Sequence, residues 1–290
     1  MKVNLKLLVV LVVAAFVLSS VSAQAYSVTF QSYSSPGNTT DSSGLTSQYA
    51  TNANNNPSGS FVMTIGGVLA LVDPSTGTAY FTETFDVDGG IPHTVTVGGG
   101  GTVTFESAGG GFSSISNPLT ELYSTSTTGV RVGTQGYAAA PAGDTTNFAF
   151  IPGHNGALPT SMQVLYGPEI SAGQYISYMG LYVGSIDTYN SLIFYNLADS
   201  PIFTITGQNL LDIFHGTSGN QTAPASNLYI NIAFNSNENF SSFSYNTNGV
   251  AFESDNLVTG LTTSVPEPAT MLLLGLGLVG LAGARRRFKK

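Results

Sequence analysis

The chain has 290 residues, no cysteine, no tryptophan, 42% hydrophobic residues and a formal net charge of −8. Without cysteine, disulfide bonds, thiolate metal sites and a cysteine nucleophile are all excluded. Between residues 26 and 264 the only Lys or Arg is Arg131, against fifteen Asp and Glu. A body with a single cation has almost nothing with which to neutralise phosphates, so we expect no nucleic-acid partner.

The N-terminus has the pattern of a secretory signal peptide. Two lysines precede an apolar segment at residues 7–18, and Ala23 and Ala25 form a small-residue A-x-A cleavage site. An apolar segment of this length is too short for a lasting transmembrane helix. We therefore expect signal peptidase to remove residues 1–25 and the remaining chain to be exported.

Alternating apolar and polar residues predict β-strands through most of the exported body, residues 26–264. The clearest alternation spans residues 228–234: the even-numbered residues are expected to face the core, and Tyr229, Asn231 and Ala233 to face away. The other strands are expected, in chain order, at residues 61–65, 80–85, 93–97, 102–105, 148–151, 175–183, 191–195, 202–206, 240–245 and 250–255.

Short strands separated by clusters of Gly, Asn, Ser and Pro favour an all-β fold, with the body an antiparallel β-sandwich or jelly roll. Four glycines at 98–101 predict a tight hairpin. One or two helical turns are expected at 208–214. Residues 33–59, rich in Ser, Asn, Gly and Thr, are expected to form a loosely ordered loop region. The body fits one ectodomain, with a subdivision near residues 152–168 left open.

Two acidic residues near the end of the body form the first candidate site. In a strand, Glu253 and Asp255 point to the same face. Two like charges side by side are costly unless they are solvated, protonated or shared by a cation. A solvated strand edge is the favoured interpretation. The alternative is a bound Ca²⁺, for which Asn side chains and backbone carbonyls would complete the oxygen shell.

A second candidate site lies between two expected strands, at Asp187, Tyr189 and Asn190. Asp and Asn close turns through their own side chains, which is the favoured interpretation here. The alternative is a polar and aromatic loop that binds a glycan. Asp86 and Asp88 resemble the start of a Ca²⁺ loop, but no Glu follows at the EF-hand spacing, so an acidic turn is expected.

Signatures of catalysis are scarce. The histidines His93, His154 and His215 lie far apart in the sequence and share no metal-binding spacing. Neither a G-x-S-x-G elbow nor an H-E-x-x-H pattern occurs. We assign no catalytic residue and expect a protein that is not an enzyme.

The C-terminal segment, residues 265–290, combines three features in a fixed order. A Pro-Glu-Pro triplet comes first, a glycine-rich apolar run follows, and a basic cluster ends the chain. The run is shorter than a bilayer's hydrocarbon core, and the basic end is expected to stay in the cytoplasm. The residues that carry the pattern are Pro266, Glu267, Pro268, Arg285, Arg286 and Arg287.

This segment resembles the PEP-CTERM sorting signal of Gram-negative bacteria. The resemblance implies recognition and cleavage by exosortase, a membrane-embedded protease, while the short C-terminal helix holds the chain transiently in the inner membrane. It also implies delivery to the cell surface or the extracellular matrix. A permanent single-span anchor is the alternative, and it would leave the basic tail in the mature protein.

Two elements of the body carry a second resemblance. A G-S-x-D-x-Y-N element at 184–190 and an A-F-E-x-D-N element at 251–256 are similar to elements that recur in a family of exosortase-dependent surface proteins. The likeness covers residues 168–260. It implies a β-sandwich ectodomain and carries no activity with it.

Together these features predict a secreted, exosortase-processed protein of the cell surface or exopolysaccharide matrix, without catalytic activity. One alternative is a Ca²⁺-dependent, lectin-like module that binds carbohydrate. Another is a glycan-active enzyme, since paired carboxylates can cleave glycosides.

Overall fold

The structure of the chain is a computed structural model. It describes residues 27–32, 38–39, 43–51, 53–65, 68–85, 93–97, 101–105, 115–116, 121–124, 129–152, 156–165, 174–196, 198–235, 238, 240 and 242–263. The expected signal peptide with Ala23 and Ala25, the acidic turn at Asp86 and Asp88, His154 and the sorting segment all lie outside the described residues. Within the described residues, no helix has the length and apolarity needed to cross a bilayer.

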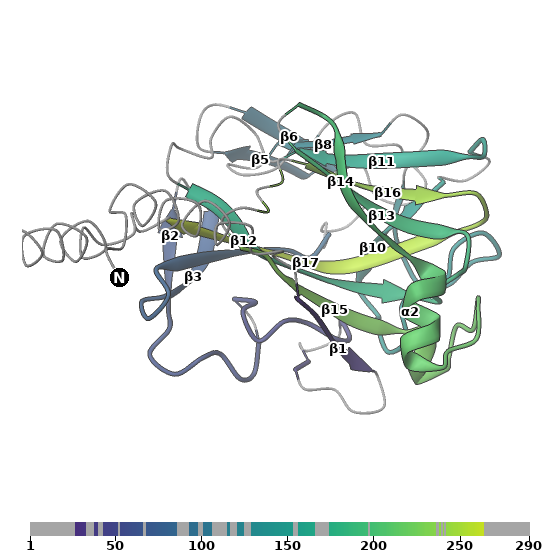
Figure 1. The fold of residues 1–290 in the computed structure, drawn as a ribbon, viewed down its shortest axis with the longest axis horizontal. Coiled ribbons are helices and arrows are strands. Elements are labelled where there is room, and N and C mark those ends of the chain that lie inside the picture. Colours follow the sequence, from purple (N-terminus) through teal and green to yellow (C-terminus); the bar gives the residue numbers. More distant parts are fainter. Residues whose placement is uncertain are drawn as a thin grey trace, which may run out of the picture.

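Two antiparallel sheets face each other in Figure 1, which confirms the sandwich-like, all-β prediction. In the larger, nine-stranded sheet, seven strands form one path, β10 pairs with β17, and β9 pairs with β10. The order along the path is β1 (Ser27–Ser32), β15 (Leu228–Ala233), β12 (Gln174–Gly184), β17 (Phe252–Thr263), β4 (Thr78–Glu83), β3 (Val68–Asp73) and β2 (Phe61–Ile65), and the two added strands are β10 (Asn147–Ile151) and β9 (Gly129–Val132).

The second sheet has six strands, and a separate hairpin joins β5 (His93–Val97) to β6 (Gly101–Phe105), as the glycines at 98–101 predict. The six strands follow the order β14 (Pro201–Thr206), β13 (Asn190–Tyr195), β16 (Ser242–Thr247), β11 (Thr160–Leu165), β8 (Glu121–Ser124) and β7 (Ile115–Ser116). In the larger sheet, β10, which ends before residue 152, pairs with β17. In the smaller sheet, β11 lies within residues 152–168 and pairs with β8 before it and with β16 after it. A subdivision near residues 152–168 stays a prediction.

The hydrophobic core lies between the two sheets. The larger sheet contributes every second residue of its central strands, such as Leu181 on β12 and Ile230 on β15, and the smaller sheet contributes residues such as Phe194 and Phe243. The alternation expected at 228–234 is confirmed, because Leu228, Ile230, Ile232 and Phe234 all belong to this core. Burying one such side chain contributes about 1.5–3 kcal/mol.

The outer face of the larger sheet is covered as well. Tyr229 is fully buried there beside Tyr182 and Leu45, so facing away from the core does not mean facing water. Leu45, Thr46, Ser47 and Ala50 are 0% exposed. The expectation of a loosely ordered region at 33–59 is therefore wrong for residues 43–50. Small residues let this loop pack closely on the tyrosines of the sheet.

Strand β17 is the central element of the larger sheet and is much longer than the segment expected at 250–255. Its first residues pair with β10 and β12, and its later residues pair with β4 and β12. The register with β12 shifts between Asp255 and Val258. Asn256 lies in this shift with a φ of 48°, a left-handed conformation that Asn tolerates.

The helix expected at 208–214 is confirmed as α2 (Gly207–Phe214), at one end of the sandwich in Figure 1. Thr206 caps its N-terminus through a reciprocal capping box with Asn209. Leu210 and Leu211 are buried in the main core. A single 3₁₀ turn, η2 (Pro224–Ser226), precedes β15.

Candidate functional site

The structure brings the two sequence elements at 184–190 and 251–256 together. They lie at the ends of neighbouring strands, the first after β12 and the second at the start of β17, where Gly184 pairs with Glu253. Between them is a small polar pocket of about 130 Å³. Ser185, Asp187, Tyr189, Ala251 and Glu253 line it, together with Gln135–Ala139 and residues near Gly219.

Glu253 is buried, with 2% of its surface exposed, because β17 runs between β10 and β12 at this point. Its Oε1 accepts a hydrogen bond of 2.8 Å from the backbone N–H of Ala139. Its Oε2 accepts one of 3.1 Å from Ser185 Oγ. Burial raises the pKa of Glu253 to about 8, against the two hydrogen bonds that lower it, and the charge of Asp187 raises it further.

Asp255 is also buried, at 0% exposure, and pairs across the sheet with Tyr182. Its negative charge adds to the burial that raises the pKa values of Tyr229 and Tyr245. The interpretation of Glu253 and Asp255 as a solvated strand edge is therefore wrong. The two side chains do share a face, the outer face of the sheet, but loops distant in the sequence cover that face.

Asp187 is held by two hydroxyl groups. Tyr189 Oη donates to Asp187 Oδ2 at 2.6 Å, and Ser218 Oγ donates to Oδ1 at 2.8 Å. Tyr189 Oη also lies 2.8 Å from the carbonyl oxygen of Val250. Burial, and then the bond to Asp187, raise the pKa of Tyr189. The Tyr189 ring passes so close to Gly249 that a Cβ there would lie 2.6 Å from it.

Asn190 joins the two elements through its amide. Nδ2 donates to the carbonyl oxygen of Ala251 at 3.1 Å, and Oδ1 accepts from Thr247 Oγ1 at 2.7 Å. The side chain is 3% exposed. With both ends of the amide bonded to the turn between β16 and β17, this side chain holds the turn against the start of β13.

The side chains of Glu253, Asp187, Tyr189 and Asn190 form a network of structural hydrogen bonds, which we call the latch. Glu253 ties the segment around Ala139 to β17, and Asp187, Tyr189 and Asn190 tie the β12–β13 connection to the loops at Ser218 and Val250. The turn is closed by the backbone, since the N–H of Asn190 donates to the carbonyl oxygen of Asp187 at 3.1 Å, whereas the expected interpretation assigns this closure to the side chains. The side chains, however, reach across much longer separations.

A calcium ion at Glu253 and Asp255 stays a prediction. Both oxygens of Glu253 already face protein donors, and a backbone N–H repels a cation where it would approach Oε1. Among the described residues, no three His, Asp or Glu side chains form a cluster that could hold a metal ion. His215 ends α2, and His93 belongs to β5.

Sequence reasoning missed that the two elements are halves of one site. It also missed the contribution of the segment around Ala139, which bears no charge or motif. The usable signal was the recurrence of polar residues at 185–190 and at 253–256, since polar residues that interrupt buried strands usually need each other as partners.

Comparison with known proteins identifies the motif in the C-terminal segment. The family model of the PEP-CTERM protein-sorting motif matches residues 264–287, which include Pro266, Glu267, Pro268 and the three arginines. No curated protein matches the chain. The chain thus carries a PEP-CTERM sorting motif, consistent with an exosortase-dependent protein, and this confirms the resemblance of the tail. The motif implies export through a membrane-bound intermediate to the cell surface or the extracellular space.

Proposed function

We propose that the chain is a non-catalytic component of the extracellular polysaccharide matrix or cell surface, placed there after exosortase has removed its tail. The observation that carries the proposal is the sorting motif at residues 264–287. This motif directs export of residues 26–264 from the cell, so the proposed role is one that a β-sandwich can perform outside the cell.

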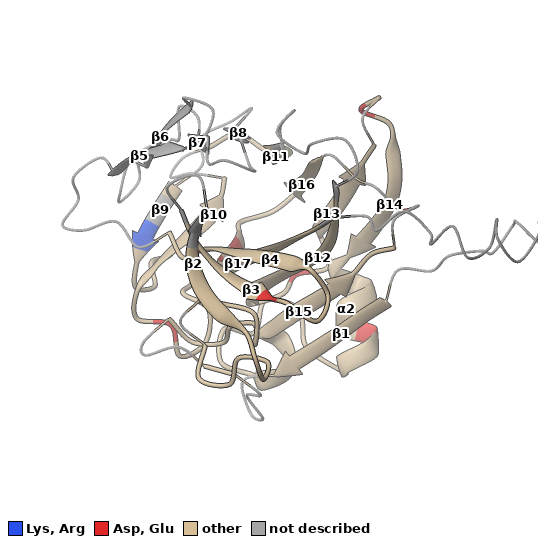
Figure 2. Cartoon of the chain, turned by 90° about the vertical axis from the view of Figure 1, so that its left-hand side faces the viewer, with Lys and Arg blue, Asp and Glu red and all other residues tan. Residues whose placement is uncertain are grey.

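The charges of the body support this role. Fifteen acidic residues and one arginine lie between residues 26 and 264. Arg131 belongs to β9, the strand on which Figure 2 shows blue. Arg131 is 8% exposed, and its guanidinium bonds to the carbonyl oxygen of Gly133 at 2.8 Å and to Tyr137 Oη at 2.7 Å. The only Lys or Arg side chain of residues 26–264 is thus hydrogen-bonded within its own loop, and this disfavours nucleic acid or anionic lipid as partners.

The latch supports a non-catalytic role over a glycan-active enzyme. Glu253 has the raised pKa of a general acid. Its pocket holds only about 130 Å³, however, whereas small-molecule sites usually have roughly 300–1,000 Å³. The carboxylates of Glu253 and Asp187 are also occupied by protein hydrogen bonds.

The proposal is tested in the producing cells. We expect the protein to fractionate with the extracellular matrix, and its deletion to weaken matrix cohesion without changing the amount of polysaccharide. Replacing Pro266, Glu267 and Pro268 by alanine should retain the protein in the membrane fraction. As a control, Asp212→Asn on the exposed side of α2 should be sorted normally.

Cleavage of the polysaccharide by purified protein, lost in Glu253→Gln, would instead establish an enzyme.

A further inference from the structure

We propose that a groove on the outer face of the larger sheet, formed by β1, β15 and β12 and by loop residues within 38–39, 43–51 and 53–55, binds a segment of a neutral saccharide. The inference deepens the proposed function by naming a ligand class, and it rests on that function for the source of the ligand. The groove has a volume of about 510 Å³, within the range of roughly 300–1,000 Å³ of small-molecule sites.

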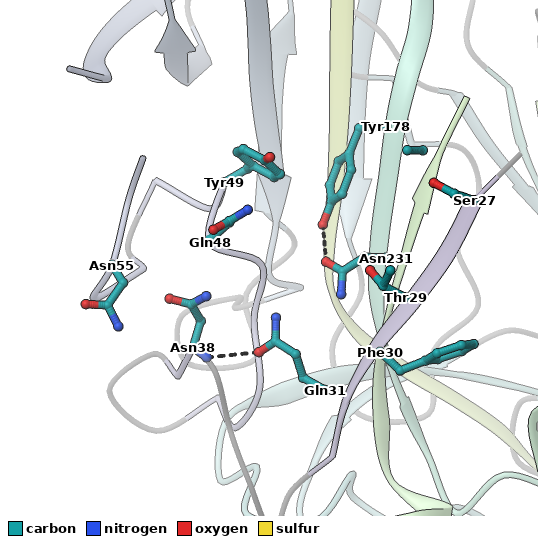
Figure 3. Close-up of a pocket in the computed structure, with 11 residues that line it drawn as sticks. Ser27, Thr29, Phe30, Gln31, Asn38, Gln48, Tyr49, Asn55, Tyr178 and Asn231 are labelled. Carbon is teal, nitrogen blue, oxygen red and sulfur yellow. Dashed lines mark hydrogen bonds between the residues drawn. The ribbon is translucent and has the colours of Figure 1, made fainter. Parts of the chain in front are cut away.

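The walls of the groove come from opposite ends of the chain. Outward-facing residues of the sheet, including Gln31 on β1, Tyr178 on β12 and Asn231 on β15, form one side. The loop contributes Gln48, Tyr49 and Asn55 on the other side. Figure 3 shows the amide side chains from the loop and the sheet grouped around one space, with the two tyrosine rings above them.

The chemistry of the lining selects an uncharged, polyhydroxylated ligand. Five of the eleven lining residues are Asn or Gln, and none is charged. A side-chain amide offers two donors and an acceptor close together, which matches neighbouring hydroxyl groups on a sugar ring. A charged ligand would lose its hydration here without an opposite charge to replace it.

Asn38 lines the groove, but its side-chain oxygen is buried. Asn38 is 8% exposed, and its Oδ1 accepts no hydrogen bond from any described residue. The backbone N–H of Asn38 donates to Gln31 Oε1 at 2.9 Å, which fixes these two residues together. A ligand in the groove would therefore meet the paired Asn38 and Gln31 without reaching this buried oxygen.

The sheet side of the groove is rigid before any ligand binds. Tyr178 Oη lies 2.6 Å from Ser47 Oγ and donates to Asn231 Oδ1 at 2.6 Å, which leaves Asn231 Nδ2 as a donor. Tyr49 stacks on Tyr80 with ring centroids 4.1 Å apart and meets Tyr178 edge-on at 5.0 Å. Tyr178 is only 6% exposed, so Tyr49, which is partly buried, is the ring that can pack against the C–H face of a sugar at little entropic cost.

The observations favour a saccharide over an extended peptide. A peptide that adds a strand would use the backbone groups along the free edge of β1. Three of the four β1 residues that line the groove, Ser27, Thr29 and Gln31, alternate along the strand and share the outer face of the sheet. The fourth, Phe30, packs against the main core.

The test is equilibrium binding of the full chain in mild detergent to uncharged hexasaccharides of glucose, galactose and mannose, with oligogalacturonate as the charged comparison. We expect at least one neutral probe to bind and oligogalacturonate not to bind. The double variant Gln48→Ala, Asn55→Ala changes exposed side chains and should weaken binding by roughly 3- to 10-fold for each hydrogen bond lost. Gln208→Ala, an exposed amide on α2 outside the groove, is the matched control and should bind normally.

Three results would overturn the inference: no neutral probe binds at millimolar concentration, the double variant and Gln208→Ala bind alike, or an uncharged unstructured peptide competes equally well. Cell fractionation separates this from the proposed function. If no probe binds but deletion of the protein still weakens the matrix, the groove assignment fails and the matrix role stands. If the probes bind but deletion leaves the matrix unchanged, the matrix role fails.

Discussion

Ser185 Oγ donates a hydrogen bond of 3.1 Å to Glu253 Oε2 across 68 residues of sequence, and both side chains are buried. This contact joins the end of β12 to the start of β17. It also lets the buried carboxyl group exist in either protonation state, because a hydroxyl group can accept from a protonated carboxyl as well as donate to a carboxylate.

The raised pKa of Glu253 makes the stability of the body depend on pH. The folded chain holds the proton with a pKa of about 8, against an ordinary value of 4.5. The folded state therefore binds more protons between these values, and the free energy of unfolding falls as the pH rises from about 4.5 through about 8. We expect a loss on the order of 3–5 kcal/mol, measured by urea unfolding at about pH 5 and about pH 9.

Glu253→Gln should remove this part of the pH dependence, because the amide keeps the shape and the hydrogen-bonding groups without ionising. Asp212→Asn, at an exposed position on α2, should keep the profile of the unaltered protein. An unchanged pH profile in the Glu253→Gln variant would show that another group is responsible.

Asn190→Ala should destabilise the fold by about 2–3 kcal/mol. The variant loses hydrogen bonds to the Ala251 carbonyl and the Thr247 hydroxyl and leaves both groups buried. Thermal unfolding measures the effect. Asn248→Ala, an exposed amide in the adjacent turn, should change the midpoint very little, and equal losses in the two variants would contradict a latch at Asn190.

Gly180→Ala should destabilise by about 1–3 kcal/mol through overpacking. A Cβ at this position would lie 2.4 Å from Tyr178 Oη and 2.6 Å from Tyr229 Oη. Since Tyr178 lines the groove, saccharide binding should weaken as well. Gly136→Ala is the control, because nothing lies within 4 Å of a Cβ there. Calorimetry of both variants checks the prediction, and a neutral Gly180→Ala would contradict the close packing of the tyrosines.

Removing divalent cations should not change the melting temperature, because both oxygens of Glu253 are already bonded to protein donors. Calorimetry with excess calcium and with chelator makes the comparison. A rise in the melting temperature with calcium that disappears in Asp255→Asn would instead establish the calcium site at Glu253 and Asp255.

Local patterns predicted much of the secondary structure. The alternation at 228–234 and the helical turns expected at 208–214 are readable from the sequence because each depends on neighbours two to four residues away. Strands such as β3 and β11 were not foreseen, and β17 extends to Thr263 beyond the segment expected. Its second half is held by pairing with β4 and β12, which no local pattern records.

The sequence by itself determined the sorting motif, because such an address is a linear pattern of residues, and it determined which side chains share a face of each strand. Only the tertiary structure decided which faces of the strands are buried. Alternation puts Glu253 and Tyr229 on the outer face of the larger sheet, but burial depends on loops at 43–51 and 135–142 folding over that face. Those contacts join residues more than a hundred positions apart, and their free energy appears only when the whole sandwich has formed.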